Sequence, residues 1–385
     1  MKVTILTAST GNGHLSAANA LEAVCKERGI TVNTHDCLKH APWAFRTWYG
    51  GGYEFIVRTK PELYGHLYKI SDERNSSFLV QTRSDYIFMA RLEKILKKED
   101  PDWVICTHSL PQPRLAMLRE KLGHFRIGVV VTDLYPHLMW LRGTPDHYFV
   151  PSEWTQQILT ERRAHVGDRI SVTGIPVHPV FGQKYDSAET REMLGIDANL
   201  PVVTITSGGI GGGPFEEALR ALISTKRPLH LEVICGRNEG RRKAIEKFVA
   251  DADTGLMKIA VRGQVSQEEM ARRMQLSEFL ISKPGGLTTS ECLACGCAML
   301  VYEPFLIPGQ EEGNADFLVS ENCGAKASGP EDLATCLNSL LDNPEKLALM
   351  RKNSLGFGRP NAASDIIDAI IEMTPVKTIP LTATH

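Results

Sequence analysis

The chain has 385 residues, of which 43% are hydrophobic and 23% charged, with a formal net charge of -2. This length exceeds one ordinary core and suits two domains of a globular protein. The near-zero net charge excludes a general binder of polyanions such as nucleic acids, and no run of 18 or more apolar residues indicates a membrane-spanning helix.

The chain begins with a strand-like segment at residues 3–7, rather than with the apolar core and cleavage site of a signal peptide. Nine cysteines are scattered along it, a usage that fits reduced thiols. From both features we expect a cytoplasmic protein.

Strand-like and helix-like segments alternate through the first half. Strands are predicted at residues 3–7, 31–34, 103–107, 126–132, 147–150 and 170–173, with helices at 16–28 and 88–98 and a helix N-cap at Ser152. This alternation predicts a doubly wound parallel sheet. The Pro/Gly-rich segment at residues 174–179 predicts a domain boundary.

A second set of the same kind follows. Strands are predicted at residues 201–206, 229–234, 257–261, 279–282 and 298–302, and helices from Phe215 and at 267–274 and 362–373. We therefore predict an α/β protein with two Rossmann-like, doubly wound domains at residues 1–178 and 179–360, facing a central cleft. Residues 361–385 form a C-terminal helix and tail. Ligands of such sheets bind beyond the carboxyl ends of the strands.

A glycine-rich loop at residues 207–213 follows the strand at 201–206. Glycines let backbone N–H groups approach a phosphate, and the dipole of the following helix assists. The Gly-Lys-Ser/Thr ending of a P-loop is absent. We interpret this loop as a phosphate site, with a flexible surface loop as the alternative.

Residues 283–291 form a second candidate phosphate site. A strand ends at Ser282, the chain turns at Gly285 and Gly286, and a helix is predicted to start near Thr288. Its free N–H groups suit a diphosphate. On the first turn, Glu291 could accept hydrogen bonds from a ribose diol, but its spacing from Thr288 equally fits a capping box.

A proline-pinned loop at residues 304–314 presents amide and carboxylate side chains together. This combination suits a polyhydroxylated sugar. An acidic solvated loop is the alternative.

Two ionisable residues lie at strand ends in the first half. His14 follows the loop at residues 11–13 and faces the predicted cleft, so it is a candidate general base. A structural histidine at a helix N-terminus is the alternative. Asp133 follows an apolar strand and could orient a base or bind an acceptor hydroxyl, or it could be a helix cap or turn residue.

Two residue clusters complete the sequence pattern. Eight of the 27 aromatic residues lie within residues 43–68, mixed with arginine, lysine and glycine. They predict a bilayer interface or a lipid-acceptor groove, with a packed aromatic helix pair as the alternative. Cys292, Cys295 and Cys297 lack the further ligands of a zinc site, so we expect small buried side chains on a helix.

Six motifs, in their order and spacing, resemble the monogalactosyldiacylglycerol synthase and processive diacylglycerol glucosyltransferase family (glycosyltransferase family 28). They lie at residues 6–14, 131–133, 173–179, 235–238, 283–288 and 308–314. The resemblance implies a GT-B fold, an N-terminal acceptor-binding domain that associates with a membrane, and a C-terminal domain that holds a UDP-sugar. It also implies that the last helix returns to the first domain.

The resemblance implies an inverting hexosyltransferase that moves glucose or galactose to a lipid acceptor, diacylglycerol, at the inner face of the membrane, without a cofactor or metal. It implies His14 as catalytic base, assisted by Asp133. The implied donor-binding residues are Ser207, Gly208, Gly209, Gly212, Gly236, Arg237, Asn238, Gly263, Val265, Lys283, Pro284, Gly285, Gly286, Thr288, Glu291, Gln310, Glu311 and Asn314. The implied acceptor-binding residues are Gly13, His14, Trp48 and Tyr49.

Within the donor set the resemblance implies Glu291 on the ribose, the two glycine loops on the diphosphate, and Gln310 and Glu311 on hexose hydroxyls. Two alternatives remain for the function. One is a UDP-sugar 2-epimerase, against which the aromatic stretch argues. The other is a non-catalytic UDP-sugar sensor at a membrane, against which His14 beside a full donor set argues.

Overall fold

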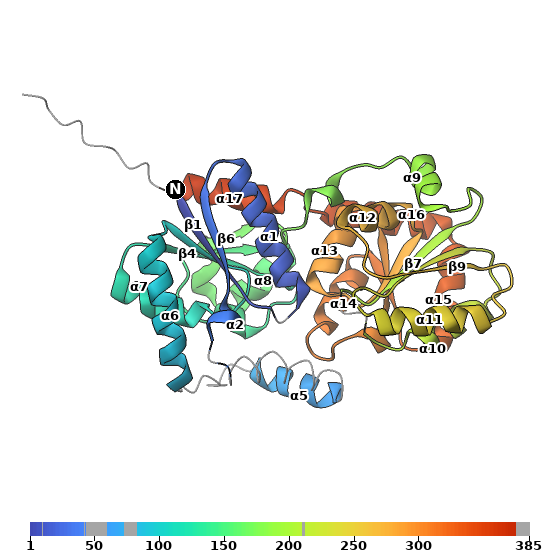
Figure 1. Ribbon diagram of the computed structural model, residues 1–385, viewed down its shortest axis with the longest axis horizontal. Helices are drawn as coiled ribbons and strands as arrows, with labels where there is room; N and C mark the ends of the chain where they lie inside the picture. Colours follow the sequence, from blue (N-terminus) through green and yellow to red (C-terminus); the bar gives the residue numbers. More distant parts are fainter. Residues whose placement is uncertain (10, 42, 44–59, 73–82, 210–211, 375–385) are drawn as a thin grey trace, which may run out of the picture.

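The computed structural model forms two lobes that lie side by side (Figure 1). It describes residues 1–9, 11–41, 43, 60–72, 83–209 and 212–374. Each lobe is built around one six-stranded parallel sheet with helices on both faces. This is the two-domain, doubly wound α/β architecture that the sequence predicted; the domain limits at residues 178 and 360 stay a prediction.

The sheet of the first lobe has the strand order β2-β1-β3-β4-β5-β6. Its strands are β1 (Lys2–Thr7), β2 (Thr31–Asp36), β3 (Trp103–Cys106), β4 (Arg126–Val130), β5 (His147–Val150) and β6 (Ile170–Val172). Its helices are α1 (Asn12–Glu27), α2 (Cys37–His40), α5 (Pro61–Ser71), α6 (Arg83–Glu99), α7 (Gln112–Leu122) and α8 (Glu153–Arg162), with 3-10 turns η2 (Leu138–Leu141) and η3 (Ala164–Arg169).

The sheet of the second lobe has the order β12-β11-β10-β7-β8-β9. Its strands are β7 (Val202–Thr206), β8 (His230–Ile234), β9 (Lys258–Arg262), β10 (Phe279–Ser282), β11 (Ala298–Tyr302) and β12 (Gly324–Ala327). Its helices are α9 (Ser187–Leu194), α10 (Phe215–Ser224), α11 (Glu239–Asp251), α12 (Gln267–Leu276), α13 (Gly286–Ala294), α14 (Glu312–Ser320), α15 (Pro330–Leu341) and α16 (Pro344–Phe357), with η4 (Pro179–Gly182) and η5 (Glu303–Phe305).

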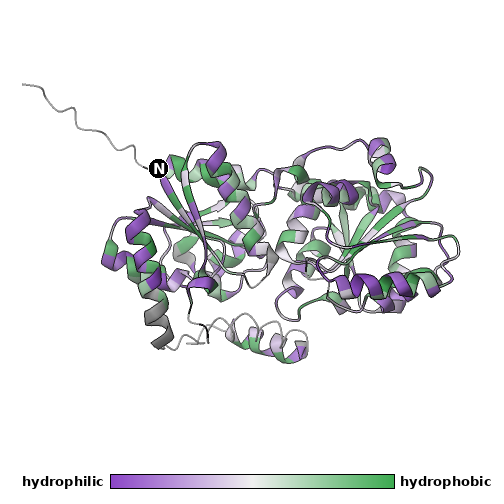
Figure 2. Cartoon of the chain, in the orientation of Figure 1, coloured by the Kyte–Doolittle hydropathy of each residue, from purple (hydrophilic) through white to green (hydrophobic). Residues whose placement is uncertain are grey.

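Both faces of each sheet are covered, which explains the near-continuous apolar strands (Figure 2). Successive strand residues point to opposite faces. On β1, Ile5 packs in a cluster with Leu21 of α1 and Ile366, whereas Leu6 packs in the cluster that contains Leu92 of α6. The two cores of this lobe therefore follow directly from the period-two pattern of its strands.

The last helix, α17 (Ala362–Met373), lies against the first lobe beside α1 (Figure 1). Its Ile366, Ile367 and Ile370 are fully buried with α1 and the first sheet. The indole nitrogen of Trp103 donates to the Thr374 hydroxyl at 2.8 Å. The chain thus crosses between the lobes twice, after β6 and after α16. Among the described residues, no helix is long and apolar enough to cross a membrane.

Two helices begin earlier than the sequence predicted. α1 starts at Asn12 instead of residue 16, so Asn12, Gly13 and His14 form its first turn rather than a loop. α13 starts at Gly286 instead of near Thr288. In both cases the first turn contains a glycine, a poor helix former, and this hid the two helix starts from the sequence pattern.

Each sheet has one point at which the order of its strands reverses. In a doubly wound fold the ligand-binding crevice forms at this point. In the first sheet the reversal lies between β1 and β3, and in the second between β7 and β10. The loops after β1, β7 and β10 carry most of the predicted site residues. The topology therefore supports a site at the carboxyl ends of β1, β3, β7 and β10.

Candidate active site

The first turns of α1 and α13 meet directly across the two lobes. A Cβ atom added at Gly13 of α1 would lie 3.5 Å from the Cβ of Leu287 in α13. A Cβ at Gly286 would lie only 2.0 Å from the carbonyl oxygen of Thr132, beyond β4. The absence of a side chain at Gly286 therefore permits the N-terminus of α13 to lie against the first lobe.

His14 is half-buried in the first turn of α1, and its ring is held from one side. Its Nδ1 lies 3.0 Å from the Thr107 carbonyl oxygen and 2.8 Å from the Thr132 hydroxyl. Because a carbonyl can only accept, this contact places the proton on Nδ1 and makes Nε2 the basic atom of the ring. Thr107 also donates its hydroxyl to the His14 carbonyl at 2.9 Å.

Burial lowers the pKa of His14 to about 4, and its hydrogen bond with Thr107 offsets part of this effect. The imidazole is therefore neutral at pH 7. A neutral ring with Nδ1 anchored and Nε2 basic has the form that a general base requires. The catalytic role of His14 stays a prediction.

A second histidine lies beside His14. The His108 ring packs edge-on against the His14 ring, with centroids 4.5 Å apart. His108 is buried, and burial and the neighbouring His14 hold its pKa well below the ordinary value. Its Nδ1 accepts the Leu110 N–H at 2.9 Å. His108 was not predicted as a site residue, although it directly follows the predicted strand at residues 103–107, as a site residue of this fold would.

Asp133 lies in the same wall, but the contacts that hold the His14 ring come from Thr107 and Thr132. The Trp140 indole N–H donates to the Asp133 carboxylate at 3.0 Å. Burial raises the pKa of Asp133 to about 6, the Trp140 hydrogen bond opposes this, and the charge of Glu311 in the second lobe adds to it. Asp133 thus lies close enough to Glu311 for the two carboxyl groups to interact.

The glycine loop after β7 packs against the loop after β8. A Cβ at Gly236 would lie 2.7 Å from the Gly209 carbonyl oxygen, and Gly236 has a positive φ of 61°. The Arg237 N–H donates to that same carbonyl at 3.2 Å. Gly208 lies near Lys283, whose Cε would be 3.6 Å from an added Cβ. The predicted loops at residues 207–213 and 283–288 are therefore neighbours.

The remaining residues of this edge border the same loops. Ser207 is buried and Gly212 partly so. Asn238 is the N-cap of α11 and accepts the Arg241 N–H at 2.9 Å. Gly263 lies beside Gly236, with an added Cβ 3.8 Å from its carbonyl oxygen, and Val265 follows half-buried in the same loop.

Lys283 and Glu311 join two loops, residues 283–288 and residues 304–314, which are named below the diphosphate loop and the sugar loop after their predicted ligands. Their Nζ and Oε1 atoms are 2.5 Å apart. The other oxygen of Glu311 accepts the Ile307 N–H at 2.9 Å. Gly285 lies alongside, with an added Cβ 3.3 Å from Glu311 Oε1. Both oxygens of Glu311 thus have protein partners, although each keeps a further lone pair for a ligand.

Asn314 is fully buried and connects three segments. Its amide nitrogen donates to the Pro284 carbonyl at 2.9 Å, and its amide oxygen accepts the Tyr135 N–H at 3.1 Å. Gln310 accepts the Tyr64 hydroxyl at 3.0 Å, so it too is held from the first lobe. Direct donor contacts of Asn314 and Gln310 stay predictions.

Glu291 lies on the second turn of α13 rather than the first, because the helix begins at Gly286. The capping-box alternative is wrong, since Gly285 is the N-cap and Thr288 lies half-buried inside the first turn. Burial raises the pKa of Glu291 to about 8. At pH 7 its carboxyl group is therefore largely protonated and can both donate and accept.

Most of the aromatic stretch, including the predicted acceptor residues Trp48 and Tyr49, lies outside the described residues. Trp43 is 73% exposed. In α5, Tyr64 and Tyr68 point inward, and the Tyr68 ring packs against His137 with centroids 4.5 Å apart. Another face of α5 exposes Leu63, Leu67 and Ile70. This segment thus combines a packed aromatic face with an exposed apolar one.

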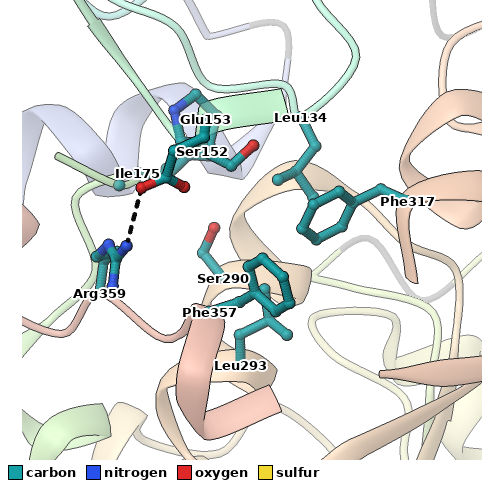
Figure 3. A pocket seen from close by; sticks show the side chains of 11 residues that line it. Leu134, Ser152, Glu153, Ile175, Ser290, Leu293, Phe317, Phe357 and Arg359 are labelled. Carbon is teal, nitrogen blue, oxygen red and sulfur yellow. Dashed lines mark hydrogen bonds and ion pairs between the residues drawn. The ribbon is translucent and has the colours of Figure 1, made fainter. Parts of the chain in front are cut away.

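A crevice lies between the lobes beside the two chain crossings (Figure 3). Leu134, Ile175 and Phe317 line it with the polar pair Glu153 and Arg359, which are 3.4 Å apart. Ser290 of α13 also borders it, so the helix of the diphosphate site forms one of its walls.

Cys292, Cys295 and Cys297 are buried in one core cluster, as predicted. Only Cys292 lies on a helix, however, because α13 ends at Ala294 and Cys295 is its C-cap. Over the described ranges, His, Cys, Asp and Glu nowhere gather in a group of three or more that could hold a metal ion.

The first half of the chain matches a known family. Residues 14–177 match the family of monogalactosyldiacylglycerol (MGDG) synthases. The processive diacylglycerol beta-glucosyltransferase of Bacillus pumilus (strain SAFR-032) is 26% identical over 389 residues, covering 98% of this chain and 96% of its own. That of Bacillus subtilis (strain 168) is 24% identical over 388 residues with the same coverage.

Solved structures match the fold over nearly the whole chain. The crystal structure of Acinetobacter baumannii MurG gives a TM-score of 0.66 at 16% identity, covering 97% of this chain and 99% of that one. The Staphylococcus aureus MnaA–UDP co-structure gives 0.63 at 15% identity, with 97% and 96% covered. These likenesses confirm the GT-B fold. The resemblance that the motifs indicated is likewise confirmed: the chain is similar to the monogalactosyldiacylglycerol synthase and processive diacylglycerol glucosyltransferase family.

Proposed function

We propose that this chain is an inverting hexosyltransferase that transfers glucose or galactose from a UDP-sugar to diacylglycerol in a membrane. One observation carries the proposal: the first turn of α1, with a neutral and anchored His14, lies directly against the first turn of α13. A base and a helix N-terminus suited to a diphosphate are thus adjacent. The lipid acceptor is proposed from the activities for which the similar proteins are named.

In the proposed reaction His14 removes the proton from the acceptor hydroxyl. As this proton moves to Nε2, the acceptor oxygen attacks C1 of the hexose from the face opposite UDP. The bond between C1 and the diphosphate oxygen breaks, and UDP leaves with the electron pair. The Thr107 carbonyl and the Thr132 hydroxyl keep the ring oriented while it becomes charged.

The negative charge that develops on the diphosphate needs nearby donors. We assign this role to the backbone N–H groups of the loop at residues 207–213, to the N-terminus of α13 and to Lys283. Such preorganised dipoles stabilise charge without reorganising during the reaction. No cofactor forms part of the proposal.

Three side chains are assigned to donor hydroxyls. Glu291, with its raised pKa, is assigned to the ribose because a neutral carboxyl can donate to one hydroxyl and accept from the other. Gln310 and Glu311 are assigned to the hexose. Their loop lies next to Lys283 and faces Asp133 across the lobes, so the hexose would lie between diphosphate and base.

The acceptor side is assigned to the membrane surface at its cytoplasmic face. Diacylglycerol stays in a bilayer, so the first lobe must reach it there. Leu63, Leu67 and Ile70 share the outward face of α5, where a surface helix normally carries polar residues. With the exposed Trp43 they suit the interfacial region of a bilayer.

One assay tests the proposal against its alternatives. The protein is incubated with UDP-glucose or UDP-galactose and diacylglycerol liposomes. Glycolipid formation with release of UDP is expected. An isomerised nucleotide sugar would instead support an epimerase, and binding without release of UDP would support a non-catalytic sensor. The family match to lipid glycosyltransferases disfavours both.

A further inference from the structure

The C-terminal end of helix α5 is anchored to the first lobe by hydrogen bonds. The Asp72 carboxylate, at the helix C-cap, accepts both Arg162 nitrogens at 2.8 and 3.0 Å and the Leu138 N–H at 2.6 Å. The Ser71 hydroxyl contacts His137 Nε2 at 3.0 Å. This bidentate, charge-assisted anchor fixes the helix to α8 and η2.

The body of α5, however, contacts the second lobe. A Cβ at Gly65 would lie 2.8 Å from Pro308, and one at Gly309 would lie 3.0 Å from the Gly65 carbonyl oxygen, so glycines permit the close approach. Lys69 and Glu312 form an ion pair at 2.8 Å. Figure 1 shows α5 apart from the first sheet and beneath the second lobe. The helix therefore spans the two lobes at the sugar loop.

The polar contact at the centre of this interface is the hydroxyl of Tyr64, which donates to the amide oxygen of Gln310 at 3.0 Å. A glutamine amide can present either end, and only its partners decide which one. The Tyr64 hydroxyl thus helps to hold the Gln310 side chain in place from the other lobe. Gln310 is also the side chain assigned above to the hexose.

We propose that Tyr64 is a positioning residue of the hexose subsite, which is complete only when α5 lies on the sugar loop. This inference rests on the proposed function in one respect, the placement of the hexose at Gln310. Recognition of the sugar is then linked to the acceptor-binding lobe. The UDP part of the donor, held by α13 and the loops after β7 and β8, does not depend on this contact.

Tyr64→Phe tests the proposal, because it removes one hydroxyl and keeps the ring. Calorimetric titration of the full chain with UDP, UDP-glucose and UDP-galactose measures binding without any lipid. The UDP-hexose that binds is expected to lose about 3- to 10-fold in affinity, as for one lost hydrogen bond. The affinity for UDP should stay within about twofold. The ratio of the two affinities is a readout that a general loss of folding would not change.

Two variants sharpen the test. Tyr68→Phe removes the same atom one turn further on, where the ring packs on His137, and should leave both affinities unchanged. Tyr64→Phe should cause no further loss when Gln310 is already alanine, because its effect acts through that side chain. Unchanged UDP-hexose binding in Tyr64→Phe, an equal loss for UDP, an equal effect of Tyr68→Phe, or additive losses would each overturn the proposal.

These readouts separate the inference from the proposed function. A chain that binds UDP-hexose as described but makes no glycolipid on liposomes would contradict the acceptor assignment alone. A chain that makes glycolipid with an unaltered Tyr64→Phe affinity ratio would contradict the role of Tyr64 alone.

Discussion

Burial displaces the pKa values of two site residues in opposite directions. The pKa of His14 falls to about 4 and that of Glu291 rises to about 8, because burial disfavours the charged form of each. Both groups are therefore mainly uncharged at pH 7. One can accept a proton, and the other can act as donor and acceptor towards a diol. Such opposite shifts are a recurrent feature of acid–base sites.

Replacing His14 by alanine should lower turnover about 100-fold or more, the usual contribution of a general base. The measurement is the rate of UDP release with saturating UDP-hexose and diacylglycerol liposomes. His124→Ala, at an exposed histidine between α7 and β4, is the matched control and should keep wild-type turnover. Near-normal turnover of His14→Ala would remove His14 from the catalytic role.

Replacing Glu291 by glutamine should change how stability depends on pH. Since the folded pKa of about 8 lies above the ordinary 4.5, the folded state binds more protons between these values. The contribution of Glu291 to stability is therefore greatest below the ordinary pKa of 4.5 and is lost as pH rises through the folded pKa of about 8. The fall should amount to about 2 kcal/mol, less than full linkage because the side chain is partly accessible.

Urea unfolding at pH 5 and pH 9 measures this difference. Glu291→Gln should lose less stability than the wild type over that interval. Glu192→Gln, on the exposed side of α9, should follow the wild type. Parallel curves for Glu291→Gln and the wild type would contradict a raised pKa of Glu291.

At the scale of elements, the site depends on two helices that have a glycine in their first turn. The first turn of α1 carries Gly13 and His14, and α13 begins at Gly286. Side chains at these glycines would meet Leu287 and the Thr132 carbonyl. Close packing of the two N-termini brings the base and the diphosphate helix together, and neither helix alone contains the site.

Gly286→Ala should therefore separate the two helix starts, because the new Cβ would lie 2.0 Å from the Thr132 carbonyl oxygen. We expect kcat/KM to fall by about tenfold or more, since small misplacements of reacting groups are costly. Gly356→Ala, in α16, is the control: its Cβ meets nothing within 4 Å, and alanine favours the helix. Unchanged kinetics in Gly286→Ala would show that the lobes need not approach so closely.

At the scale of the whole molecule, the described residues join the lobes at further places besides the two helix starts. Asn314 joins Pro284 to Tyr135 at the centre, α5 lies over the sugar loop, and α17 returns to the first lobe. The Asn314 bridge is fully buried, so each of its backbone partners depends on it. The relative position of the lobes is therefore fixed by polar contacts as well as by the chain crossings.

Asn314→Ala should destabilise the chain by about 1–3 kcal/mol, because it leaves a buried carbonyl and a buried N–H without their partner. It should also raise the KM for UDP-hexose, since the Pro284 carbonyl belongs to the diphosphate loop. Denaturant unfolding and initial rates measure the two effects. Asn361→Ala, at an exposed helix start, should change neither. Wild-type stability of Asn314→Ala would rule out the bridge.

Much of the fold was predictable because buried parallel strands are short apolar runs. The strands at residues 147–150, 279–282 and 298–302 and the helix at 362–373 agree with the structure. The starts of α1 and α13 were predicted too late along the chain, because glycines lie in their first turns. In the site, His14 and the glycine loops were identifiable from strand ends and motifs. The contacts of His108 with His14 and of Tyr64 with Gln310 were not, because these partners are 94 and 246 residues apart in the chain.

The sequence by itself determined the fold class, the family resemblance and the candidate groups of the site, because local periodicity and motif spacing are properties of neighbouring residues. Only the tertiary structure decided which groups meet. Burial between packed elements sets the pKa values of His14 and Glu291. The approach of the lobes brings Tyr64 to Gln310 and Asn314 to Tyr135. Such contacts depend on distance in space, which no local pattern encodes.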